Sequence, residues 1–430
     1  MPSLRARGVR GWAFTYYYTV SRKGYATLHR TRTLTSPEQL SERVGRVRPS
    51  PTLAVTARAA ELRAAGRDII GLGAGEPDFD TPEHIKEAAI AAIRAGQTKY
   101  TPVDGTPALK QAVIDKFRRE NDLDFTPEEI LVSCGGKQSF YNLAQALLDP
   151  GDEVVIPAPY WVSYPDMVLL ADGVPVIVPA GPDQRFKITP EQLEGALTER
   201  TRLFVINSPS NPTGMAYSEA ELAALGAVLR RHPRVMIATD DMYEHIRWSE
   251  APFRNILNVC PDLRERTVVL NGVSKAYAMT GWRIGYAGGP AWLIRAMKKI
   301  QSQSTSNPAS VSQAAAEAAL NGDQQCVRDM VAAFRARHDW LVEALDRLPG
   351  VHCLPGDGTF YTFPSFHEVI EAMPDVDDDV ALAEKLIEEA NVALVPGSAF
   401  GAPGHMRLSF ATSIEVLREA VERIARVLPG

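Results

Sequence analysis

The sequence predicts an α/β protein built around a mainly parallel β-sheet. From Ile130 onward, short apolar runs alternate with helical sequence, and each run ends in a polar or aromatic group. Alternating strands and helices favour a parallel sheet with helices on both faces. After about Asn321 the pattern changes to one long helix and several shorter strands, which is typical of a smaller α+β domain. We therefore expect a large domain over 81–320 and a small domain over 321–430, which the segment 40–80 joins.

Composition narrows the function classes. The chain has 430 residues, of which 45% are apolar and 23% charged, with a net charge of −6. These values are ordinary for a soluble globular protein, and they lack the basic character of a nucleic-acid binder. No apolar run is long enough to span a membrane, so we expect a cytoplasmic protein. The four cysteines are scattered, without a CxxC pair or a histidine at ligand spacing, so we expect buried free thiols and no zinc or other metal site.

The first 37 residues differ from the rest of the chain. They contain arginines and a lysine but no acidic residue before Glu38. A basic leader of this kind is compatible with a transit peptide. It lacks a clear amphipathic period and the apolar centre of a secretory signal. We favour the alternative that residues 1–39 form a basic, disordered extension.

The first elements of the folded part are helices around a glycine-rich loop. The spacing predicts a helix over Leu53–Ala65, ending at Gly66, and a second helix that begins at Thr81 and Pro82 and ends at Gly96, with Thr81 as N-cap. Between them, the cluster Gly71–Asp78 has the spacing G-x-G-x-G and a proline where a helix would begin. That pattern does not fit a dinucleotide-binding fingerprint.

Five apolar runs are expected to form strands that end in candidate functional groups. They are Ile130–Ser133, Glu153–Ile156, Leu203–Ile206, Val235–Ala238 and Thr267–Leu270. Ligands of such sheets bind beyond the carboxyl ends of the strands. A further run, Ile284–Ala287, follows Arg283 instead of preceding it. For Arg283 to reach the same edge, that strand must be antiparallel to the others.

The C-terminal part carries shorter elements. We expect a long helix over Cys326–Leu348 and a last helix after the capping box formed by Thr412 and Glu415. Four strands are expected between these helices, over Val351–Leu354, Phe360–Phe363, Val392–Val395 and Met406–Phe410.

The stretch that carries the chemistry comes directly after the run Thr267–Leu270. Lys275 lies beside Ser274, and Arg283 comes eight residues after the lysine, among glycines. This composition suits an amine held near a phosphate, although a solvated lysine and arginine on a loop would look similar. Together with Ser-Pro-Ser-Asn-Pro-Thr-Gly at 208–214 and Gly-His-Met-Arg-Leu-Ser-Phe at 404–410, it resembles the class I/II pyridoxal-phosphate-dependent aminotransferases of fold type I. The resemblance extends from about residue 48 to residue 410.

The resemblance implies a fold and a cofactor. The fold would be PLP fold type I, in which a large domain with a mainly parallel seven-stranded sheet is joined to a smaller α+β domain. Pyridoxal phosphate needs an amine, an acid for its pyridine nitrogen, donors for its phenolic oxygen and a flat wall for its ring. Lys275 would bond to the cofactor and carry the proton, Asp240 would hold the pyridine nitrogen, Asn211 and Tyr243 would bind the phenolic oxygen, and Trp161 would stack on the ring.

The phosphate would bind at a helix N-terminus. Gly135, Gly136 and Lys137 follow a strand and open a helix, and Arg283 would add a charged clamp. Simpler interpretations exist for single residues. An aspartate after a strand is often a helix cap, Trp161 suits a core, and Asn-Pro-Thr-Gly is a common turn. The order of the motifs and their place at strand ends favour the cofactor site.

The resemblance adds substrate and partner contacts. Arg407 would hold the α-carboxylate of the substrate, and Gly75 would let the substrate approach the backbone. Tyr100 would reach the phosphate of a neighbouring subunit, which implies a homodimer with shared active sites. One branch of the family has a serine where this chain has Gly272, so that phosphate contact is missing, and Ser274 is a candidate replacement.

The overall likeness is greatest to bacterial aspartate aminotransferases of subgroup I-beta, some of which also use prephenate. We expect an amino group to move from an L-amino acid, aspartate or glutamate, to a 2-oxo acid. Lys137 is the candidate partner of a distal carboxylate, and Arg48 resembles the basic residue that accompanies prephenate use. A PLP-dependent lyase, a cyclopropane-carboxylate-type synthase or another amino-acid aminotransferase shares these cofactor residues. A PLP-binding regulator is disfavoured, because no DNA-binding helix-turn-helix region is evident.

Overall fold

The structure is a computed structural model that describes residues 40–429. Our expectation for residues 1–39 therefore lies outside the described residues. Contacts along the chain separate Met1–Ser41 from Glu42–Gly430, and the helices and strands of the described residues all belong to the second unit.

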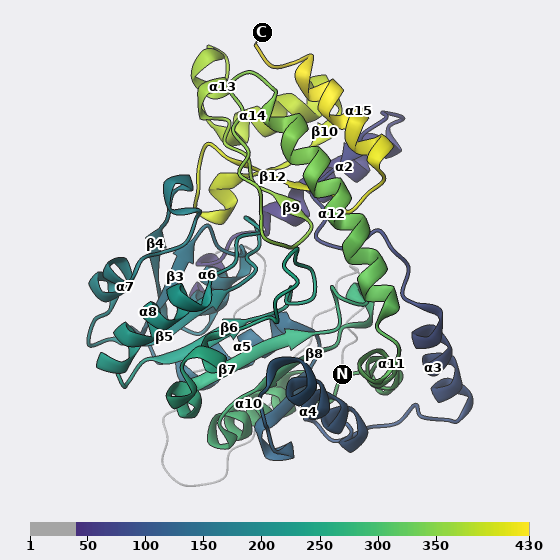
Figure 1. The fold of residues 1–430 in the computed structure, drawn as a ribbon, viewed down its shortest axis with the longest axis vertical. Helices are drawn as coiled ribbons and strands as arrows, with labels where there is room; N and C mark the ends of the chain where they lie inside the picture. Colours follow the sequence, from purple (N-terminus) through teal and green to yellow (C-terminus); the bar gives the residue numbers. More distant parts are fainter. Residues whose placement is uncertain (1–39, 430) are drawn as a thin grey trace, which may run out of the picture. The chain divides into compact units, whose positions relative to one another are not determined.

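A seven-stranded sheet organises most of this unit (Figure 1). In spatial order its strands are β2 (Ile130–Ser133), β8 (Gly285–Gly288), β7 (Thr267–Gly272), β6 (Met236–Asp240), β5 (Thr201–Asn207), β3 (Glu153–Ala158) and β4 (Val174–Pro179). The pairs among β7, β6, β5, β3 and β4 are parallel, whereas β8 is antiparallel to both of its neighbours. The predicted α/β class and the predicted reversal of the strand after Arg283 are confirmed.

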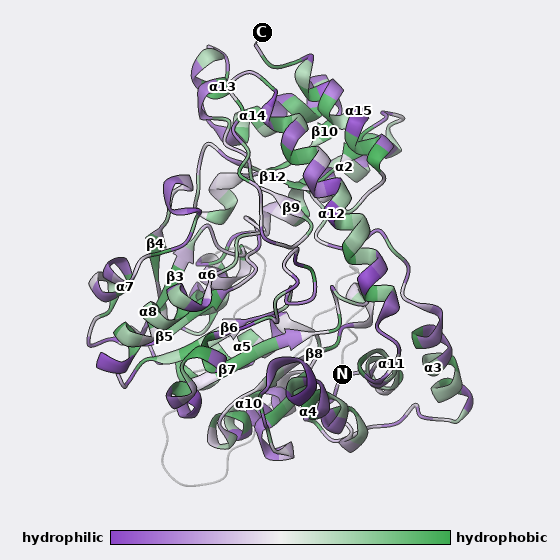
Figure 2. Ribbon diagram, viewed as in Figure 1, coloured by the Kyte–Doolittle hydropathy of each residue, from purple (hydrophilic) through white to green (hydrophobic). Residues whose placement is uncertain are grey.

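Alternating side chains of the strands bury both faces of this sheet. In β5, Leu203 and Val205 pack with α5 (Gly136–Leu147), α6 (Ser163–Leu170) and α10 (Ala291–Ser304). The intervening Phe204 and Ile206 pack with α8 (Glu219–Arg231) and α9 (Ile256–Val259). On the β2 side, α3 (Glu83–Arg94), α4 (Pro107–Asn121) and α11 (Ser310–Asn321) form a further core. Figure 2 shows the corresponding apolar colouring of the central strands and the mixed colouring of the outer helices.

Two short sheets and a separate core are built from the C-terminal part and residues near Ile70. β1 (Ile70–Gly71) pairs with β10 (Val392–Ala393), and β12 (Met406–Ser409) lies between β11 (Val395–Pro396) and β9 (Tyr361–Thr362). The apolar faces of α12 (Gln325–Asp346), α14 (Asp379–Lys385) and α15 (Ile414–Ala425) pack against them. The remaining helices are α1 (Glu42–Gly45), α2 (Pro51–Ala64), α7 (Pro190–Ala196) and α13 (His367–Ala372). We propose that the two short sheets and the helices α12, α13, α14 and α15 form the small domain, and that the segment 40–80 belongs to it because β1 pairs with β10. Helix α7 packs instead against strands of the seven-stranded sheet.

The predicted N-caps of α3 and of the last helix, α15, were both wrong. Thr81 does not cap α3, because its hydroxyl donates to the carbonyl of Ala278 at 2.7 Å and accepts from the indole N–H of Trp282 at 3.0 Å. The last helix is capped by Ser413 in place of Thr412, and the Ser413 hydroxyl accepts from the N–H of Val416 at 3.3 Å.

Two further expectations need correction. Residues Val351–Leu354 do not form a strand and make only an isolated bridge, His352 with Ser365, because the chain turns away after one pair. All four cysteines are free, but only Cys260 and Cys353 are buried, whereas Cys134 and Cys326 are partly exposed.

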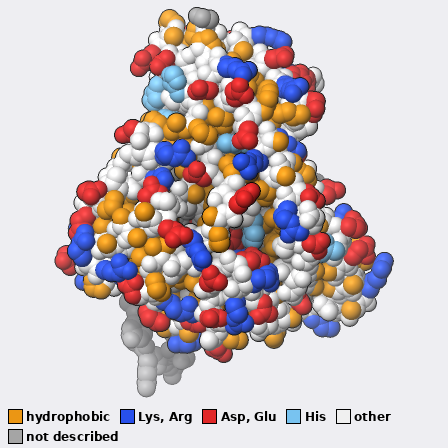
Figure 3. Space-filling model, in the orientation of Figure 1, with side chains coloured by type: hydrophobic (Ala, Val, Ile, Leu, Met, Phe, Trp, Pro, Cys, Tyr) orange, Lys and Arg blue, Asp and Glu red, His pale blue; other side chains and the backbone are white. Residues whose placement is uncertain are grey.

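The described surface is mixed in charge. Figure 3 shows lysines and arginines interspersed with aspartates and glutamates on the face in view. Among the helices of residues 40–429, none combines the length and the apolar character that a membrane span requires.

Candidate active site

The carboxyl ends of β5, β6 and β7 open into a cavity of about 440 Å³. Its lining also includes Trp161 after β3, the loop around Gly75, the start of α5, residues of α2, and Arg407 on β12. Every candidate site residue lines this cavity except Gly135, Tyr100 and Arg48. Candidate residues that are 332 positions apart in the sequence, Gly75 and Arg407, therefore meet at one place.

Lys275 lies in the loop that follows β7. It is partly buried, and its amine donates a hydrogen bond to the carbonyl oxygen of Gly75. Burial lowers the pKa of Lys275 to about 8, and the charge of Arg407 acts in the same direction. The side chain is therefore an amine that loses its proton near neutral pH, as a nucleophile or a proton carrier requires.

Asp240 ends β6 and is buried. Its Oδ1 accepts from the backbone N–H of Met242 at 3.2 Å, and its Oδ2 accepts from the hydroxyl of Tyr164. Burial raises the pKa of Asp240, while the hydrogen bonds from Tyr164 and Met242 and the charge of Lys275 oppose that rise. The carboxylate thus faces the cavity with a donor on each oxygen.

Asn211 and Tyr243 lie beside Asp240 and Arg407. The Oδ1 of Asn211 accepts from Arg407 at 3.0 Å, and the hydroxyls of Tyr243 and Tyr361 are 3.1 Å apart. Burial raises the pKa of Tyr243 well above its usual value, so its hydroxyl stays protonated and can donate. These two side chains supply an amide and a phenol to the same wall of the cavity.

The N-terminus of α5 forms a cradle with Arg283. Gly135 has φ = 87°, a conformation that favours glycine, and a Cβ there would lie 2.3 Å from a guanidinium nitrogen of Arg283. Arg283 itself donates to the carbonyl of Thr280 at 2.8 Å. Backbone N–H groups, the helix dipole and a guanidinium therefore converge on one spot, which suits a phosphate.

Gly272 occupies a crowded position. A Cβ at Gly272 would lie 3.1 Å from Cα of Gly285, from the carbonyl oxygen of Ile284 and from the methyl group of Met242. A serine there would require these neighbours to shift slightly. Ser274, the candidate replacement, is buried and lines the cavity.

Arg407 has hydrogen-bond donors that no described residue accepts. It is only 2% exposed, and its terminal nitrogens donate to Asn211 and, at 2.7 Å, to the carbonyl of Gly73. Its Nε has no hydrogen-bond partner among the described residues. A buried guanidinium with free N–H groups at a cavity is suited to a carboxylate, which it can bind through two bonds.

Three candidate residues have different surroundings. Lys137 lines the cavity, with its amine 5.2 Å from the ring centroid of Trp161, and burial and the charge of Arg283 lower its pKa. Arg48 lies outside the lining, and its charge acts on Asp166. The ring of Tyr100 is 92% exposed, away from the cavity of its own chain.

Sequence reasoning missed several lining or supporting residues. Tyr361 presents its hydroxyl to Tyr243 and lies under Arg407, whose guanidinium is 4.4 Å from the Tyr361 ring centroid. Thr280 donates to the carboxylate of Glu76 at 2.9 Å. Tyr164 lies within Trp-Val-Ser-Tyr-Pro, and its hydroxyl donates to Asp240, which is 76 residues away. The α2 residues of the lining carry no local signal of this role.

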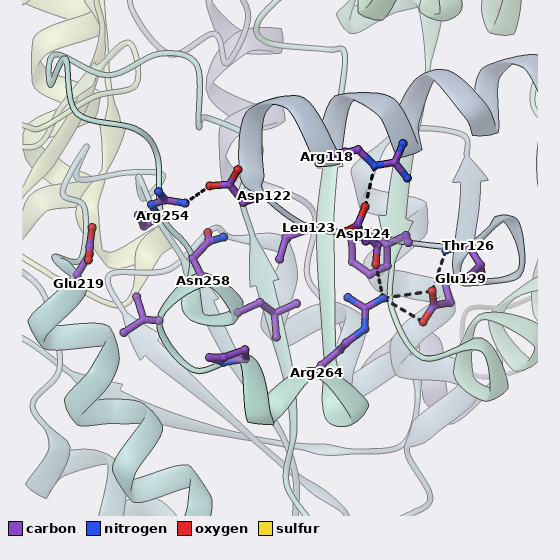
Figure 4. Close-up of a pocket in the computed structure, with 14 residues that line it drawn as sticks. Arg118, Asp122, Leu123, Asp124, Thr126, Glu129, Glu219, Arg254, Asn258 and Arg264 are labelled. Carbon is purple, nitrogen blue, oxygen red and sulfur yellow. Dashed lines mark hydrogen bonds and ion pairs between the residues drawn. The ribbon is translucent and has the colours of Figure 1, made fainter.

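A larger hollow of about 950 Å³ lies elsewhere, between the end of α4 and residues 254–264 (Figure 4). Apart from Glu219, its charged side chains pair with one another. Arg118 contacts Asp124 and Arg254 contacts Asp122, each at 2.7 Å, and Arg264 lies 3.2 Å from Glu129. Since these charges are already paired, we do not consider it a candidate site.

Another buried group of charges lies beside the cavity. The carboxylate of Glu244 accepts from Lys116, from Asn121 at 2.6 Å and from Asn271 at 2.8 Å. Glu120, Glu244 and His245 are close enough together to hold a metal ion. The ammonium of Lys116 already supplies the positive charge there, so we assign the group a structural role.

Comparison with known proteins agrees with this geometry. The family model "Aminotransferase class I and II" matches residues 67–424. An aspartate/prephenate aminotransferase of Nitrosomonas europaea is 63% identical over 395 residues, which cover 91% of this chain and all of the relative. An aspartate aminotransferase of Geobacillus stearothermophilus is 52% identical over 392 residues, which cover 91% of this chain and 99% of the relative.

Solved structures are similar over the same region. The aspartate aminotransferase of Rhizobium meliloti has a TM-score of 0.88 at 48% identity and covers 91% of this chain and 100% of its own. The Thermus thermophilus enzyme with maleate has a TM-score of 0.84 at 48% identity, with coverage of 90% and 99%. The chain therefore belongs to the class I and II aminotransferase family, has the α/β architecture of PLP fold type I, and is a pyridoxal-phosphate-dependent aminotransferase that moves an amino group between amino and 2-oxo acids.

Proposed function

We propose that this cavity binds pyridoxal phosphate and moves the amino group of L-aspartate or L-glutamate to a 2-oxo acid, with prephenate among the acceptors. The observation that carries the proposal is that Lys275, Asp240 and Arg407, from three separate parts of the chain, line one cavity of about 440 Å³. The names of relatives that use aspartate and prephenate support the choice of substrates.

The residues present fit the cofactor. The lack of a Cβ at Gly135 lets the guanidinium of Arg283 lie against the N-terminus of α5, where it can bind a phosphate together with the backbone N–H groups. Trp161 would cover one face of the ring, and Asn211 and Tyr243 would donate to the phenolic oxygen. When bound, pyridoxal phosphate supplies an aldehyde that accepts the amino group and a ring that draws electrons from the substrate α-carbon.

Residues of the chain then perform the proton and binding steps. Arg407 holds the substrate α-carboxylate through its free N–H groups and so orients the α-carbon. Lys275 takes the proton from that carbon and delivers it to the cofactor carbon that carried the aldehyde. The lowered pKa of Lys275 favours this role. Asp240, as a carboxylate, holds a proton on the ring nitrogen.

Two finer points complete the proposal. Lys137, which lines the cavity, would pair with the second carboxylate of an acidic substrate. Arg48, which lies outside the lining, would contribute to the binding of prephenate. The exposed Tyr100 supports a homodimer in which each subunit contributes a residue to the site of its partner.

The test is a steady-state assay of the protein loaded with pyridoxal phosphate. We expect continuous formation of oxaloacetate from L-aspartate only when a second 2-oxo acid, such as 2-oxoglutarate or prephenate, is also present. The variant Lys275→Ala is expected to keep the cofactor through its phosphate but to lose nearly all turnover. A lyase would instead release product from the amino acid alone, and that result would reject the proposal.

A further inference from the structure

A buried tyrosine reaches the carboxylate that we assign to the cofactor ring. Tyr164, in the first turn of α6, is 1% exposed, and its hydroxyl donates to Oδ2 of Asp240. The other oxygen, Oδ1, accepts from the N–H of Met242 at 3.2 Å. Each carboxylate oxygen therefore has one donor from the protein, and the two donors come from different elements.

Packing fixes the Tyr164 ring. It lies 4.8 Å from the Phe140 ring and 5.2 Å from the Trp161 ring, measured between centroids, and the contact with Trp161 is edge to face at 90°. The N–H of Tyr164 donates to the carbonyl of Trp161 at 3.0 Å. The same short segment therefore supplies both the wall of the cavity and the donor to Asp240.

The surroundings of Asp240 indicate what the hydrogen bond from Tyr164 does. The charge of Lys275 acts on Asp240, and the charge of Asp240 in turn acts on Asp241 and Tyr243. The carboxyl group of Asp241 is engaged elsewhere, with Thr239 and Asn255, each at 2.7 Å. Burial disfavours the anionic form of Asp240, so donors are needed to keep it ionised.

Tyr164 is suited to donate and not to exchange its proton. Burial, together with the charge of Asp240, raises the pKa of Tyr164 well above its usual value. Its hydroxyl therefore keeps its hydrogen throughout the neutral range. The pKa of Asp240 stays raised, but the hydrogen bond from Tyr164 is the largest of the causes that lower it.

We propose that Tyr164 is a positioning residue, whose hydroxyl fixes the Asp240 carboxylate and keeps it ionised, so that the ring nitrogen of bound pyridoxal phosphate holds a proton. This inference rests on the proposed function. Tyr164 touches neither the cavity nor the substrate, and it acts through Asp240.

The decisive variant is Tyr164→Phe, which keeps the packed ring and removes only the donor. Tyr217→Phe is the matched control, since Tyr217 is also largely buried and its hydroxyl makes one hydrogen bond, from the N–H of Ile188 at 3.1 Å, outside the site. Each cofactor-free protein is titrated with pyridoxal phosphate labelled with ¹⁵N in the ring, and its ring resonance and dissociation constant are measured near neutral pH.

Wild type and Tyr217→Phe are expected to show the resonance of a protonated ring nitrogen. In Tyr164→Phe the resonance is expected to move toward the unprotonated position, and the dissociation constant to rise about tenfold or more, the effect of one hydrogen bond to a charged group. If Tyr164→Phe matches Tyr217→Phe in both measurements, the inference is wrong. If wild type itself fails to bind the cofactor, the proposed function fails and not this inference alone.

A second variant keeps the inference testable if Tyr164→Phe does not fold. Tyr164→Met fills much of the same space with a flexible apolar side chain and likewise has no O–H donor. It is expected to lose the protonated resonance. A folded Tyr164→Met protein that keeps that resonance would overturn the inference.

Discussion

Replacing Arg407 by lysine tests the contribution of bidentate hydrogen bonding between its guanidinium and the substrate α-carboxylate. The substitution keeps a positive charge at the end of a long side chain but replaces a planar group that has five N–H donors by one that has three. In the structure, Arg407 gives one N–H to Asn211 and one to the carbonyl of Gly73, which leaves Nε and one hydrogen on each terminal nitrogen free.

The expected loss of kcat/KM follows from the number of N–H donors that remain free for the substrate. A lysine that serves the same two acceptors has one hydrogen left, so the substrate α-carboxylate keeps one of its two bonds. A hydrogen bond to a charged group contributes about 1.5–3 kcal/mol. Arg407→Lys should therefore lower kcat/KM about 10- to 150-fold.

The assay compares L-aspartate with L-alanine, each with 2-oxoglutarate as acceptor. Because both amino acids carry the same α-carboxylate, the loss should be the same factor for both. Lys137→Met is the matched control, in which the ratio between the two substrates should change. A loss below about threefold, or a loss confined to L-aspartate, would refute the assignment of Arg407 to the α-carboxylate.

Other predictions concern specificity, stability and pH. Lys137→Met should lower kcat/KM for L-aspartate about tenfold more than for L-alanine, and Arg48→Ala should mainly lower kcat/KM for prephenate; equal losses for all three substrates would contradict both roles. Glu244→Gln leaves the buried ammonium of Lys116 without its nearest counter-charge and should lower the free energy of unfolding, measured with urea, by about 3–5 kcal/mol. Adding Lys116→Met to this variant should restore most of the loss. Attachment of pyridoxal phosphate requires the uncharged amine of Lys275, whose pKa is lowered to about 8. The rate of attachment, followed by stopped-flow absorbance, should therefore rise with pH and level off above about pH 8. A rate that still rises up to the usual lysine pKa of 10.5 would contradict this.

The central strands were predictable because each is a compact apolar run. Thr267–Leu270 was predicted and lies within β7, Thr267–Gly272, which has a neighbouring strand on each side. β4, over Val174–Pro179, was not predicted, because it contains two prolines and several exposed residues. As the edge strand of the sheet, β4 tolerates prolines that a central strand would not.

The candidate site was predictable where single motifs mark strand ends. Lys275, Asp240 and Asn211 follow strands in the sequence, and the structure brings them to one cavity. Tyr164 and Tyr361 were missed, because their importance comes from partners far along the chain, 76 and 118 residues away. Such pairs have no local signature, since they depend on how separate elements pack.

The most direct test of the account monitors one half of the reaction at a time. The protein is loaded with pyridoxal phosphate, freed of excess cofactor and mixed with L-aspartate in the absence of any 2-oxo acid. We predict a burst of a single equivalent of oxaloacetate per active site, after which product formation stops until 2-oxoglutarate is added and releases an equivalent of L-glutamate. Continuous release of product from L-aspartate alone, or no release at all, would contradict the claim that this cavity stores and transfers an amino group.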